Sequence, residues 1–362
     1  MEGGGKVKVY NVKAVMTDEE IKNREGSYFN EKDIKLLVDH DADVFAEKPD
    51  GTKELLIRFR KNVFPEAITK LAWDAFHKTA AASRNRGAAA GPINLNSPCW
   101  KKRKPTEIKG WSTRYIQKGK KSAMRVNNNV FSSVLGYFEK TPFMKLPCRL
   151  TSYTQTYFKY YKQGIPFIQA INEQFKKLIP DRYKAQEKIA KSTPSYIIPG
   201  TIFSSLTVNR NFRTALHKDA GDLPQGFGNL SVVEQGHYQG GYTVFPQYGV
   251  GVNCRTGDFL AMDVHQWHSN TEMYESASDK KFNEKLPKSF GHNLETGTMG
   301  SDKKYSRISF VCYYREKLQA CDKKESQAYY KRIGFDENKG WLKKGPKETR
   351  KQKKGTKDLI PE

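Results

Sequence analysis

Short apolar runs separated by glycine-containing turns occupy the middle of this chain, and they constrain its fold more than any other feature. Residues 202–208 are rich in β-branched and apolar side chains, as strands are. Similar runs follow at 230–233, 242–245 and 259–264, with turn signals at 226–228, 240–241, 249–251 and 257–258. Short strands at this spacing predict an antiparallel sandwich or barrel.

A candidate metal site is carried by these predicted strands. His217 and Asp219 are two residues apart, so on an extended segment their side chains project to the same side. A distant second histidine would complete a three-ligand facial site with open coordination positions, the arrangement of non-haem Fe(II) oxygenases. His265 and His268 both qualify, and because their spacing is odd, only one of them should point inward on a continuous strand.

An arginine further along the chain indicates the cosubstrate of such an enzyme. Arg307 opens the apolar run Arg-Ile-Ser-Phe-Val, which is typical of a strand. Its guanidinium can bind a carboxylate through a fixed fork of N–H groups, a geometry that a lysine would satisfy less well. The sequence therefore predicts that Arg307 binds the distal carboxylate of a 2-oxoacid.

Several motifs together resemble the TET/JBP family of nucleic-acid base oxygenases. They are the stretch from Phe203-Ser-Ser-Leu-Thr to His217-Lys-Asp219, the runs GGYTVFPQYGV and GDFLAMDVHQWHSNT, and Arg307-Ile-Ser-Phe-Val-Cys-Tyr-Tyr. The upstream run Phe175-Lys-Lys-Leu-Ile-Pro-Asp-Arg-Tyr-Lys-Ala-Gln resembles the family's helical approach to the domain. The resemblance covers about residues 130–316. His268-Ser-Asn-Thr matches the family's His-x-x-Thr run, and His265 does not.

The resemblance implies a fold and a cofactor set. The fold would be α+β, with a double-stranded β-helix (jelly-roll) oxygenase core buttressed by helices. Fe(II) would be bound by His217, Asp219 and His268, the catalytic centre. The cosubstrate 2-oxoglutarate would be bound by Arg307 with help from Ser309, and O2 would be the oxidant.

Two further positions match those that contact the substrate base in the family. Asp222, three residues after the metal aspartate, stands where members have an Asp or Asn that reads the base edge. Arg315 stands where several members have a histidine. A carboxylate at Asp222 can accept from cytosine N4 or thymine N3, so the base remains open, with 5-methylcytosine favoured. The target must be flipped out of a duplex or single-stranded.

The resemblance therefore implies oxidation of the 5-methyl group of a pyrimidine in DNA. Three alternatives remain. A relative in the family uses ascorbate as a co-substrate to add a glyceryl group to 5-methylcytosine, and ascorbate could also serve as a reductant here. A prolyl-hydroxylase-like enzyme acting on protein has a similar pattern of motifs. A binding protein with a vestigial site would not be expected to keep all four residues of the centre.

The net charge of +24 and the pI of about 9.6 favour a polyanionic partner such as DNA. One basic cluster, interleaved with Trp100, Trp111 and Tyr115, is predicted to contact nucleic acid through Lys101, Lys102, Arg103 and Lys104. The same run fits a nuclear-import signal. A second cluster lies in residues 343–357, where a solvated, partly disordered surface is the alternative.

The pattern predicts three parts: a basic, mostly helical region at 1–129, an oxygenase domain at 130–316 and a basic, partly disordered tail at 317–362. Two amphipathic helices are predicted, one after Pro65 with apolar residues to Phe76, and one over 167–178 that ends before Pro180. The small-residue segment 86–92 is interpreted as a structural turn, with close approach to a ligand as the alternative. The polar spacer at about 272–304 is predicted to be an exposed inserted loop.

The five cysteines are odd in number and lack CxxC spacing, so neither a disulfide framework nor a zinc site is predicted. A reducing compartment is the simpler interpretation. No apolar stretch approaches the ~20 residues of a membrane span, and the first residues lack a secretory signal. We expect an intracellular monomer, nuclear if its source is eukaryotic.

Overall fold

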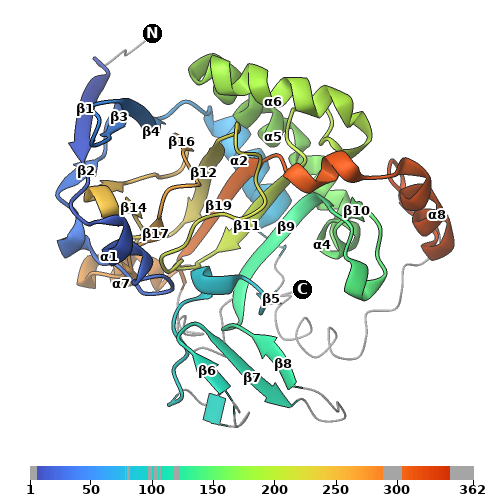
Figure 1. Ribbon diagram of the computed structural model, residues 1–362, viewed down its shortest axis with the longest axis horizontal. Helices are drawn as coiled ribbons and strands as arrows, with labels where there is room; N and C mark the ends of the chain where they lie inside the picture. The colour runs from blue at the N-terminus through green and yellow to red at the C-terminus, as the bar shows by residue number, and fades with distance from the viewer. Residues whose placement is uncertain are drawn as a thin grey trace.

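The computed structural model describes residues 6–77, 79, 82–96, 100, 101, 105, 107–116, 123–287 and 304–342. A ten-stranded sheet runs through the middle of the molecule (Figure 1). In spatial order its strands are β1 (Lys8–Lys13), β3 (Ala42–Glu47), β4 (Lys53–Arg60), β16 (Phe259–Met262), β12 (Gly228–Gln235), β19 (Ser306–Tyr313), β11 (Ser205–Arg210), β9 (Val130–Phe138) and β10 (Arg149–Leu150), and β5 (Ala82–Ser83) pairs with β9.

A four-stranded sheet faces one side of this large sheet. Its order is β17 (Ser269–Asn270), β14 (Thr243–Phe245), β15 (Val250–Val252) and β2 (Leu36–Val38). Leu230 and Leu260 from the large sheet share one hydrophobic cluster with Val250 and Val252 from the small one. The two sheets therefore pack face to face across a common core, and the α+β class predicted from the sequence is confirmed.

Strand β19 divides the core into two halves. Ile308, Phe310 and Cys312 belong to the cluster on the helical side of the large sheet. Val311 and Tyr313 belong to the cluster between the two sheets. Because successive side chains of a strand point to opposite faces, Arg307 and Ser309 project to the same side as Val311. The sequence of one strand thus places a cation in the space between the sheets.

The helices α2 (Glu66–Phe76), α5 (Phe158–Leu178) and α6 (Pro180–Ser192) cover the other side of the large sheet (Figure 1). Both predicted amphipathic helices are confirmed, with Pro65 preceding α2 and Pro180 following α5. In the predicted face of α5, Phe167, Ile168, Ile171 and Phe175 are fully buried, and Leu178 is partly buried. The helix begins earlier than predicted and continues through Pro166. It therefore buttresses the large sheet.

The prediction of a mostly helical N-terminal region was wrong. Strands β1, β3 and β4 extend the large sheet, because β4 pairs antiparallel with β16, and β2 joins the small sheet in parallel with β15. The physical signal is the alternation in β3, where Ala42, Val44 and Ala46 are buried and the residues between them are partly exposed. The N-terminal strands thus complete the two sheets of the oxygenase domain.

The remaining elements are short. They are α1 (Asp18–Lys22), α4 (Ser152–Thr156), α7 (Ala277–Asn283) and α8 (Lys323–Ile333), a sheet of β6 (Glu107–Lys109), β7 (Ser112–Ile116) and β8 (Ala123–Val126), and the pairs β13 (Gln239–Gly240) with β18 (Met273–Tyr274) and β20 (Phe335–Asp336) with β21 (Gly340–Trp341). Across the described ranges, no helix combines the length and apolar character needed to cross a membrane.

The described part of the predicted inserted loop contains regular secondary structure. Residues 288–303 lie outside the described residues, but 272–287 contain β18 and α7. A capping box between Ser276 and Asp279 starts α7. At its end, buried Asn283 donates to the carbonyl of His237 at 2.7 Å and accepts from the same residue's N–H at 2.8 Å. The helix therefore fixes the turn that precedes β13.

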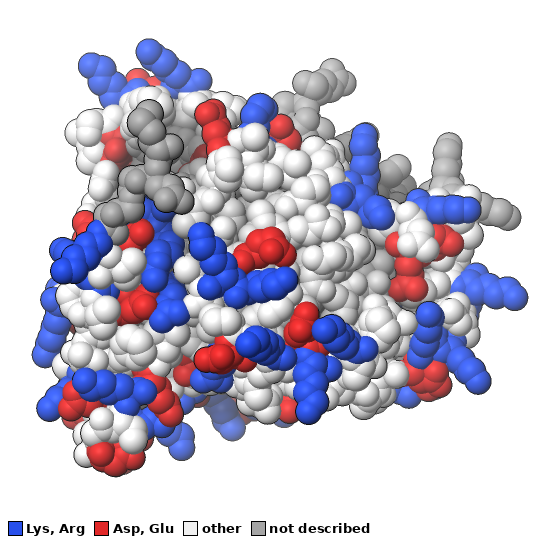
Figure 2. All heavy atoms as spheres, turned by 90° about the horizontal axis from the view of Figure 1, so that it is seen from above, with Lys and Arg blue, Asp and Glu red and all other residues white. Residues whose placement is uncertain are grey.

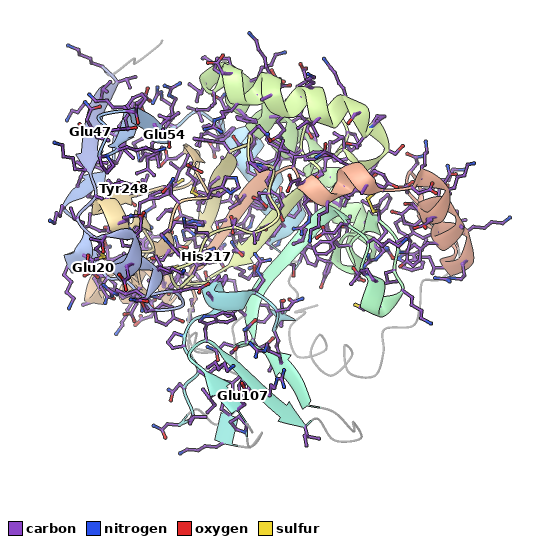
Figure 3. The ribbon with its side chains drawn as sticks, viewed as in Figure 1. Glu20, Glu47, Glu54, Glu107, His217 and Tyr248 are labelled. Carbon is purple, nitrogen blue, oxygen red and sulfur yellow. A yellow bond between two sulfur atoms is a disulfide. The ribbon has the colours of Figure 1, made fainter. Side chains whose placement is uncertain are left out.

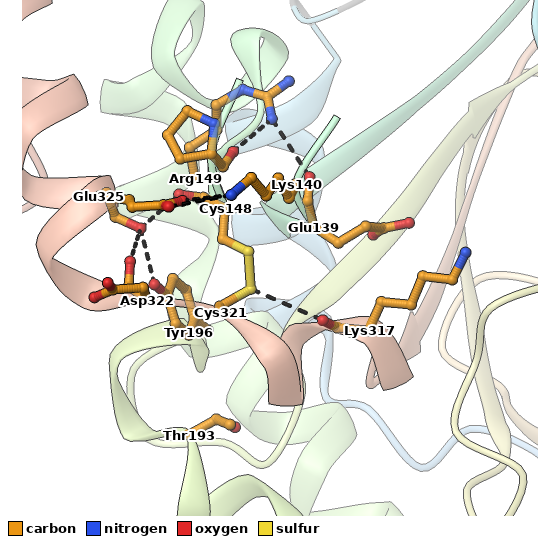
Figure 4. Close-up of a disulfide and its surroundings, with 12 residues drawn as sticks. Glu139, Lys140, Cys148, Arg149, Thr193, Tyr196, Lys317, Cys321, Asp322 and Glu325 are labelled. Atoms are coloured by element: carbon orange, nitrogen blue, oxygen red, sulfur yellow. Dashed lines mark hydrogen bonds and ion pairs between the residues drawn. A yellow bond between two sulfur atoms is a disulfide. The ribbon is translucent and has the colours of Figure 1, made fainter. Parts of the chain in front are cut away.

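The C-terminal segment is tied to the domain by a disulfide, which corrects the cysteine prediction (Figure 4). Cys148 precedes β10 and Cys321 precedes α8, at a sequence separation of 173 and with Cα atoms 5.8 Å apart. Tyr330 of α8 accepts a hydrogen bond from the backbone N–H of Leu150 at 2.6 Å. The sequence could not predict the pair because only the fold brings such distant residues together. Residues 343–362 of the predicted tail lie outside the described residues.

Candidate active site

Backbone pairing brings His217, which is labelled in Figure 3, side by side with His268. The N–H of each donates to the carbonyl of the other at 3.0 Å. The N–H of Asp219 donates to the carbonyl of Val264 at 3.0 Å, which fixes the segment after β11 against the end of β16. As a result, ligand atoms of His217, Asp219 and His268 all lie within 4.8 Å of one another.

The hydrogen bonds of the two imidazoles determine which nitrogen faces the aspartate. Nδ1 of His217 donates to the carbonyl of Ala215 at 2.8 Å, and Nδ1 of His268 donates to that of Gln266 at 2.9 Å. Each Nε2 therefore carries a lone pair, at 3.4 and 3.9 Å from the two carboxylate oxygens of Asp219. Lone pairs that converge without a proton need a cation between them, so this donor set fits a metal ion.

The electrostatics of His268 and Asp219 favour the forms of these two groups that bind metal. Burial lowers the pKa of His268 to about 4, with a further contribution from His217, so the imidazole is neutral at neutral pH. Burial alone would raise the pKa of Asp219, but the interactions of its carboxylate with His217 and His268 outweigh burial and hold that pKa well below its usual range. A neutral imidazole and an ionised carboxylate are the forms that bind metal.

His265, the competing candidate, lies elsewhere. Its Nε2 is 3.4 Å from the carbonyl oxygen of Leu223, and its backbone N–H donates to Asp263 at 3.0 Å. It is absent from the metal-ligand group found among the described residues. The arrangement therefore favours His268 as the third ligand.

A cavity between the sheets opens beside the triad. Besides the triad, its polar lining residues are Arg86, Thr207, Asn209, Thr214, Thr243, Asn270 and Ser309. Arg307 projects from the same face of β19 as Ser309 and is 5% exposed. Within the described residues, no hydrogen-bond partner reaches its buried Nε or Nη2. A buried guanidinium costs free energy unless an anion pairs with it, so Arg307 fits a bound carboxylate.

The backbone around Arg307 is fixed by one asparagine. Asn211 accepts from the N–H of Arg307 through its side chain at 2.6 Å and donates its own N–H to the carbonyl of Arg307 at 2.8 Å. It adopts a left-handed conformation, with φ of 42°, which asparagine tolerates better than most residues. This double contact ties the end of β11 to the start of β19.

Asp222 and Arg315 lie together, as the family resemblance implied. They form an isolated antiparallel bridge at the far end of β19. Within the described residues, Asp222 Oδ2 is buried without a hydrogen-bond partner. Burial, and then the charge of Asp219, raise the pKa of Asp222 well above its usual range. A carboxyl group held in this way can present both a donor and an acceptor to a ligand.

The guanidinium of Arg315 is already engaged by Glu139, which the sequence analysis did not identify. Glu139 follows β9 and binds Arg315 through both carboxylate oxygens, with Nη2 to Oε1 at 2.6 Å. The guanidinium carbon lies 4.1 Å from the centre of the Phe138 ring. No local pattern marks this pair, because its members are 176 residues apart. Glu139 therefore holds Arg315 in one orientation beside Asp222.

Arg86 is the second residue that sequence reasoning missed. It stands in the segment 86–92 that was interpreted as a structural turn, and it lines the cavity beside the triad. The small residues after it, Ala88 to Ala90, are buried and allow the segment to approach the domain closely. Their composition was the available signal for a close approach.

Only part of the predicted basic cluster lies among the described residues. Lys101 is exposed, whereas Lys102, Arg103 and Lys104 lie outside the described residues. Trp100 is buried, and its ring N–H donates to Asn128 at 2.9 Å, so this ring packs in the protein instead of facing a ligand. Figure 2 shows lysine and arginine side chains over the face that carries α6, with acidic side chains between them.

Comparison with known proteins identifies related sequences. Residues 133–316 match the family model Tet_JBP, described as the oxygenase domain of the 2OGFeDO superfamily. The chain is 38% identical over 155 residues to thymine dioxygenase JBP1 of Trypanosoma brucei brucei, which covers 42% of this chain and 18% of the relative. It is 33% identical over 189 residues to thymine dioxygenase JBP1-B of Trypanosoma cruzi. This match covers 52% of this chain and 20% of that relative.

The similarity is limited in extent. The chain spans only about a fifth of the length of these curated relatives. A solved complex of NgTET1 with 5mC DNA is similar with a TM-score of 0.45 and 13% identity, over 80% of this chain and 84% of that one.

Proposed function

Because this chain belongs to the Tet/JBP family of oxygenase domains in the 2-oxoglutarate- and Fe(II)-dependent superfamily, we propose that it oxidises the 5-methyl group of a pyrimidine in DNA. The observation that carries the proposal is the convergence of His217, Asp219 and His268 beside a cavity that is also lined by Ser309. Arg307 projects from the same face of β19 as Ser309, and its buried Nε and Nη2 have no hydrogen-bond partner among the described residues. The two facing sheets around this cavity are proposed to be the double-stranded β-helix of the superfamily.

Each residue of the centre has a proposed role. His217, Asp219 and His268 would hold Fe(II), and Arg307 with Ser309 would hold 2-oxoglutarate. When bound, iron and 2-oxoglutarate supply with O2 the oxidising power needed to break a methyl C–H bond. The chain contributes the ligands, the orientation of the cosubstrate and a cavity between the two sheets that limits the access of water.

The proposed substrate is thymine, with 5-methylcytosine as the second candidate. The sequence favoured 5-methylcytosine because a carboxylate can accept from its exocyclic amine. Two observations now favour thymine. Arg315 is a fixed donor next to Asp222, and thymine offers carbonyl oxygens on both sides of its N3–H. The curated relatives named above are thymine dioxygenases.

The test is a nucleoside analysis after incubation with DNA. The iron-loaded protein is incubated with single-stranded oligonucleotides that carry thymine or 5-methylcytosine, with 2-oxoglutarate or ascorbate in separate reactions, and the nucleosides are identified by mass spectrometry. We expect 5-hydroxymethyluracil, formed only with 2-oxoglutarate, and no product from an Arg307→Gln variant. A glyceryl adduct that requires ascorbate, or the absence of any product from either base, would contradict the proposal.

The proposed setting is intracellular, and nuclear if the source is eukaryotic. DNA is the proposed partner, with the target base flipped out or single-stranded, because a stacked base could not reach the cavity between the sheets. Of the three predicted parts, 1–129, 130–316 and 317–362, we retain only the oxygenase domain at 130–316 as a proposal. The N-terminal strands belong to the same sheets as the oxygenase core.

A further inference from the structure

The segment that carries Arg86 is held rigidly against the candidate site. The N–H of Ala215, two residues before His217, donates to the carbonyl of Ala89 at 2.9 Å. Ala89 and Ala90 pack against Val130 and Phe212 in a small hydrophobic cluster. The segment is therefore part of the wall of the site.

Two consecutive asparagines fix the same segment from behind. Asn127 accepts from the N–H of Gly87 at 2.8 Å, and its own N–H donates to the carbonyl of Arg84 at 2.9 Å. The buried side chain of Asn128 donates to the carbonyls of Ala90, Gly91 and Pro92 at 2.9 to 3.2 Å. A side chain on such a segment is preorganised, so little conformational entropy is lost when it binds a ligand.

Arg86 presents its charge to the cavity. It lines the cavity together with all three candidate metal ligands. Its Nε is buried, and no hydrogen-bond partner reaches that atom within the described residues. Burial, followed by the charge of Asp219, raises the pKa of Asp222, and the charges of Arg315 and Arg86 oppose that rise. Thr207 also lines this cavity, and its hydroxyl lies 3.2 Å from that of Tyr313, two residues before Arg315 of the Asp222–Arg315 bridge.

Arg307 does not line the cavity that Arg86 lines, although Ser309 does. Arg307 and Tyr313 stand at opposite ends of one face of β19. At about 3.4 Å per residue, they are on the order of 20 Å apart. The charge of Arg86 acts on Tyr313, as does that of Asp222. Because Arg86 lines a cavity that Arg307 does not, the distal carboxylate of the cosubstrate is left to Arg307.

We infer that Arg86 binds a phosphate group next to the pyrimidine that enters the site. The inference rests on the proposed function. The polar edge of a base would meet Asp222 and Arg315, which form the bridge at the far end of β19. A nucleotide that leaves its stack carries its flanking phosphates with it, and a guanidinium fork matches a phosphate better than any other cationic side chain does. Arg86 would thus position the target from outside the matched residues 133–316.

The experiment pairs a protein variant with a neutralised phosphate. Arg86→Gln and Arg86→Lys are compared with Arg84→Gln, a matched control in the same segment that does not line the cavity. The substrate is a short single strand with one target base, made either with natural phosphates or with uncharged methylphosphonates on both sides of the target. Affinity is measured by fluorescence anisotropy, and KM and kcat are measured for the DNA and for 2-oxoglutarate. Thermal unfolding verifies that each variant folds.

We expect Arg86→Gln to weaken DNA binding and raise the KM for DNA by roughly 10- to 100-fold, the range for a lost charge-assisted hydrogen bond. Arg86→Lys should recover part of the loss, and Arg84→Gln should behave as the wild type. On the methylphosphonate strand, the wild type should lose affinity, and Arg86→Gln should lose nothing further.

Three results would overturn the inference. They are an undiminished effect of Arg86→Gln on the methylphosphonate strand, a rise confined to the KM for 2-oxoglutarate, and no effect of Arg86→Gln at all. Failure of the proposed function is distinguishable, because a wild type that oxidises neither base can still be analysed through its affinity for the two strands.

Discussion

Asp219 is the single anion of the candidate triad, so its removal should affect metal binding more than any other change at the site. Asp219→Ala should lower iron stoichiometry by at least tenfold and abolish turnover while the fold survives. The matched control is His265→Ala, which removes a nearby histidine outside the triad. Iron bound per protein is measured after gel filtration. Equal iron content in Asp219→Ala and the wild type would refute the ligand assignment.

Asp222 is predicted to read the base without holding the metal. Asp222→Asn keeps the size of the side chain but replaces a titratable carboxyl with a fixed amide. Because the amide presents a fixed donor and a fixed acceptor, the preference between the two bases should shift by about 1–3 kcal/mol, or roughly ten- to a hundredfold in the ratio of their kcat/KM values. Competition between thymine and 5-methylcytosine oligonucleotides measures the preference, with iron content as the control. An unaltered preference would show that Asp222 does not select the base.

At the scale of elements, the Glu139–Arg315 pair joins the end of β9 to the end of β19. Both side chains are largely buried, at 14% and 12% exposure. Glu139→Gln would leave Arg315 without its counter-charge, so the free energy of unfolding should fall by about 3–5 kcal/mol. The control is Glu325→Gln, which breaks the exposed pair with Lys140 and should cost at most about 1 kcal/mol. Urea unfolding at pH 7 measures both.

The same pair gives a pH dependence. Burial alone would raise the pKa of Glu139, but the hydrogen bonds and charge of Arg315 outweigh it and leave that pKa below its usual value. A carboxyl whose pKa is lowered on folding contributes stability above its unfolded pKa, near 4.5, and loses it as the pH falls through the folded value. The difference in stability between the wild type and Glu139→Gln should therefore shrink below about pH 4.5. A difference that is constant from pH 7 to pH 3 would contradict this account.

The sequence predicted those elements whose signals are local. The 3.6-residue period marked α2 and the buried face of α5, and the glycine turns marked the short strands of the core. The His-x-Asp spacing predicted two candidate ligands on one side, and a family motif favoured His268 over His265 as the third candidate. The N-terminal strands were missed because their place in the large sheet depends on the pairing of β4 with β16, which are far apart in the sequence. Glu139 and the partner of Cys148 were missed because only tertiary folding brings such distant residues together.

At the scale of the whole molecule, the net charge of +24 should dominate the affinity for DNA. Each phosphate neutralised on single-stranded DNA contributes about −0.7 to the slope of log affinity against log salt concentration, and about −0.9 on a duplex. Removal of the basic residues 343–357 should flatten this slope by several such contributions, because we expect these residues to contact phosphates of the DNA backbone. Such contacts do not depend on the identity of the base. The removal should leave kcat on a short single strand unchanged, because the triad and its cavity lie in the described core.

Arg86→Gln should flatten the same slope by only about one contribution while it raises the KM for the target strand. The two variants therefore separate general attraction from the positioning of one nucleotide. Fluorescence anisotropy between 50 and 300 mM salt measures both slopes. An affinity for DNA that is independent of salt would contradict the proposal that DNA is the partner of this basic chain. A protein substrate with acidic groups would then be the alternative explanation for the positive charge.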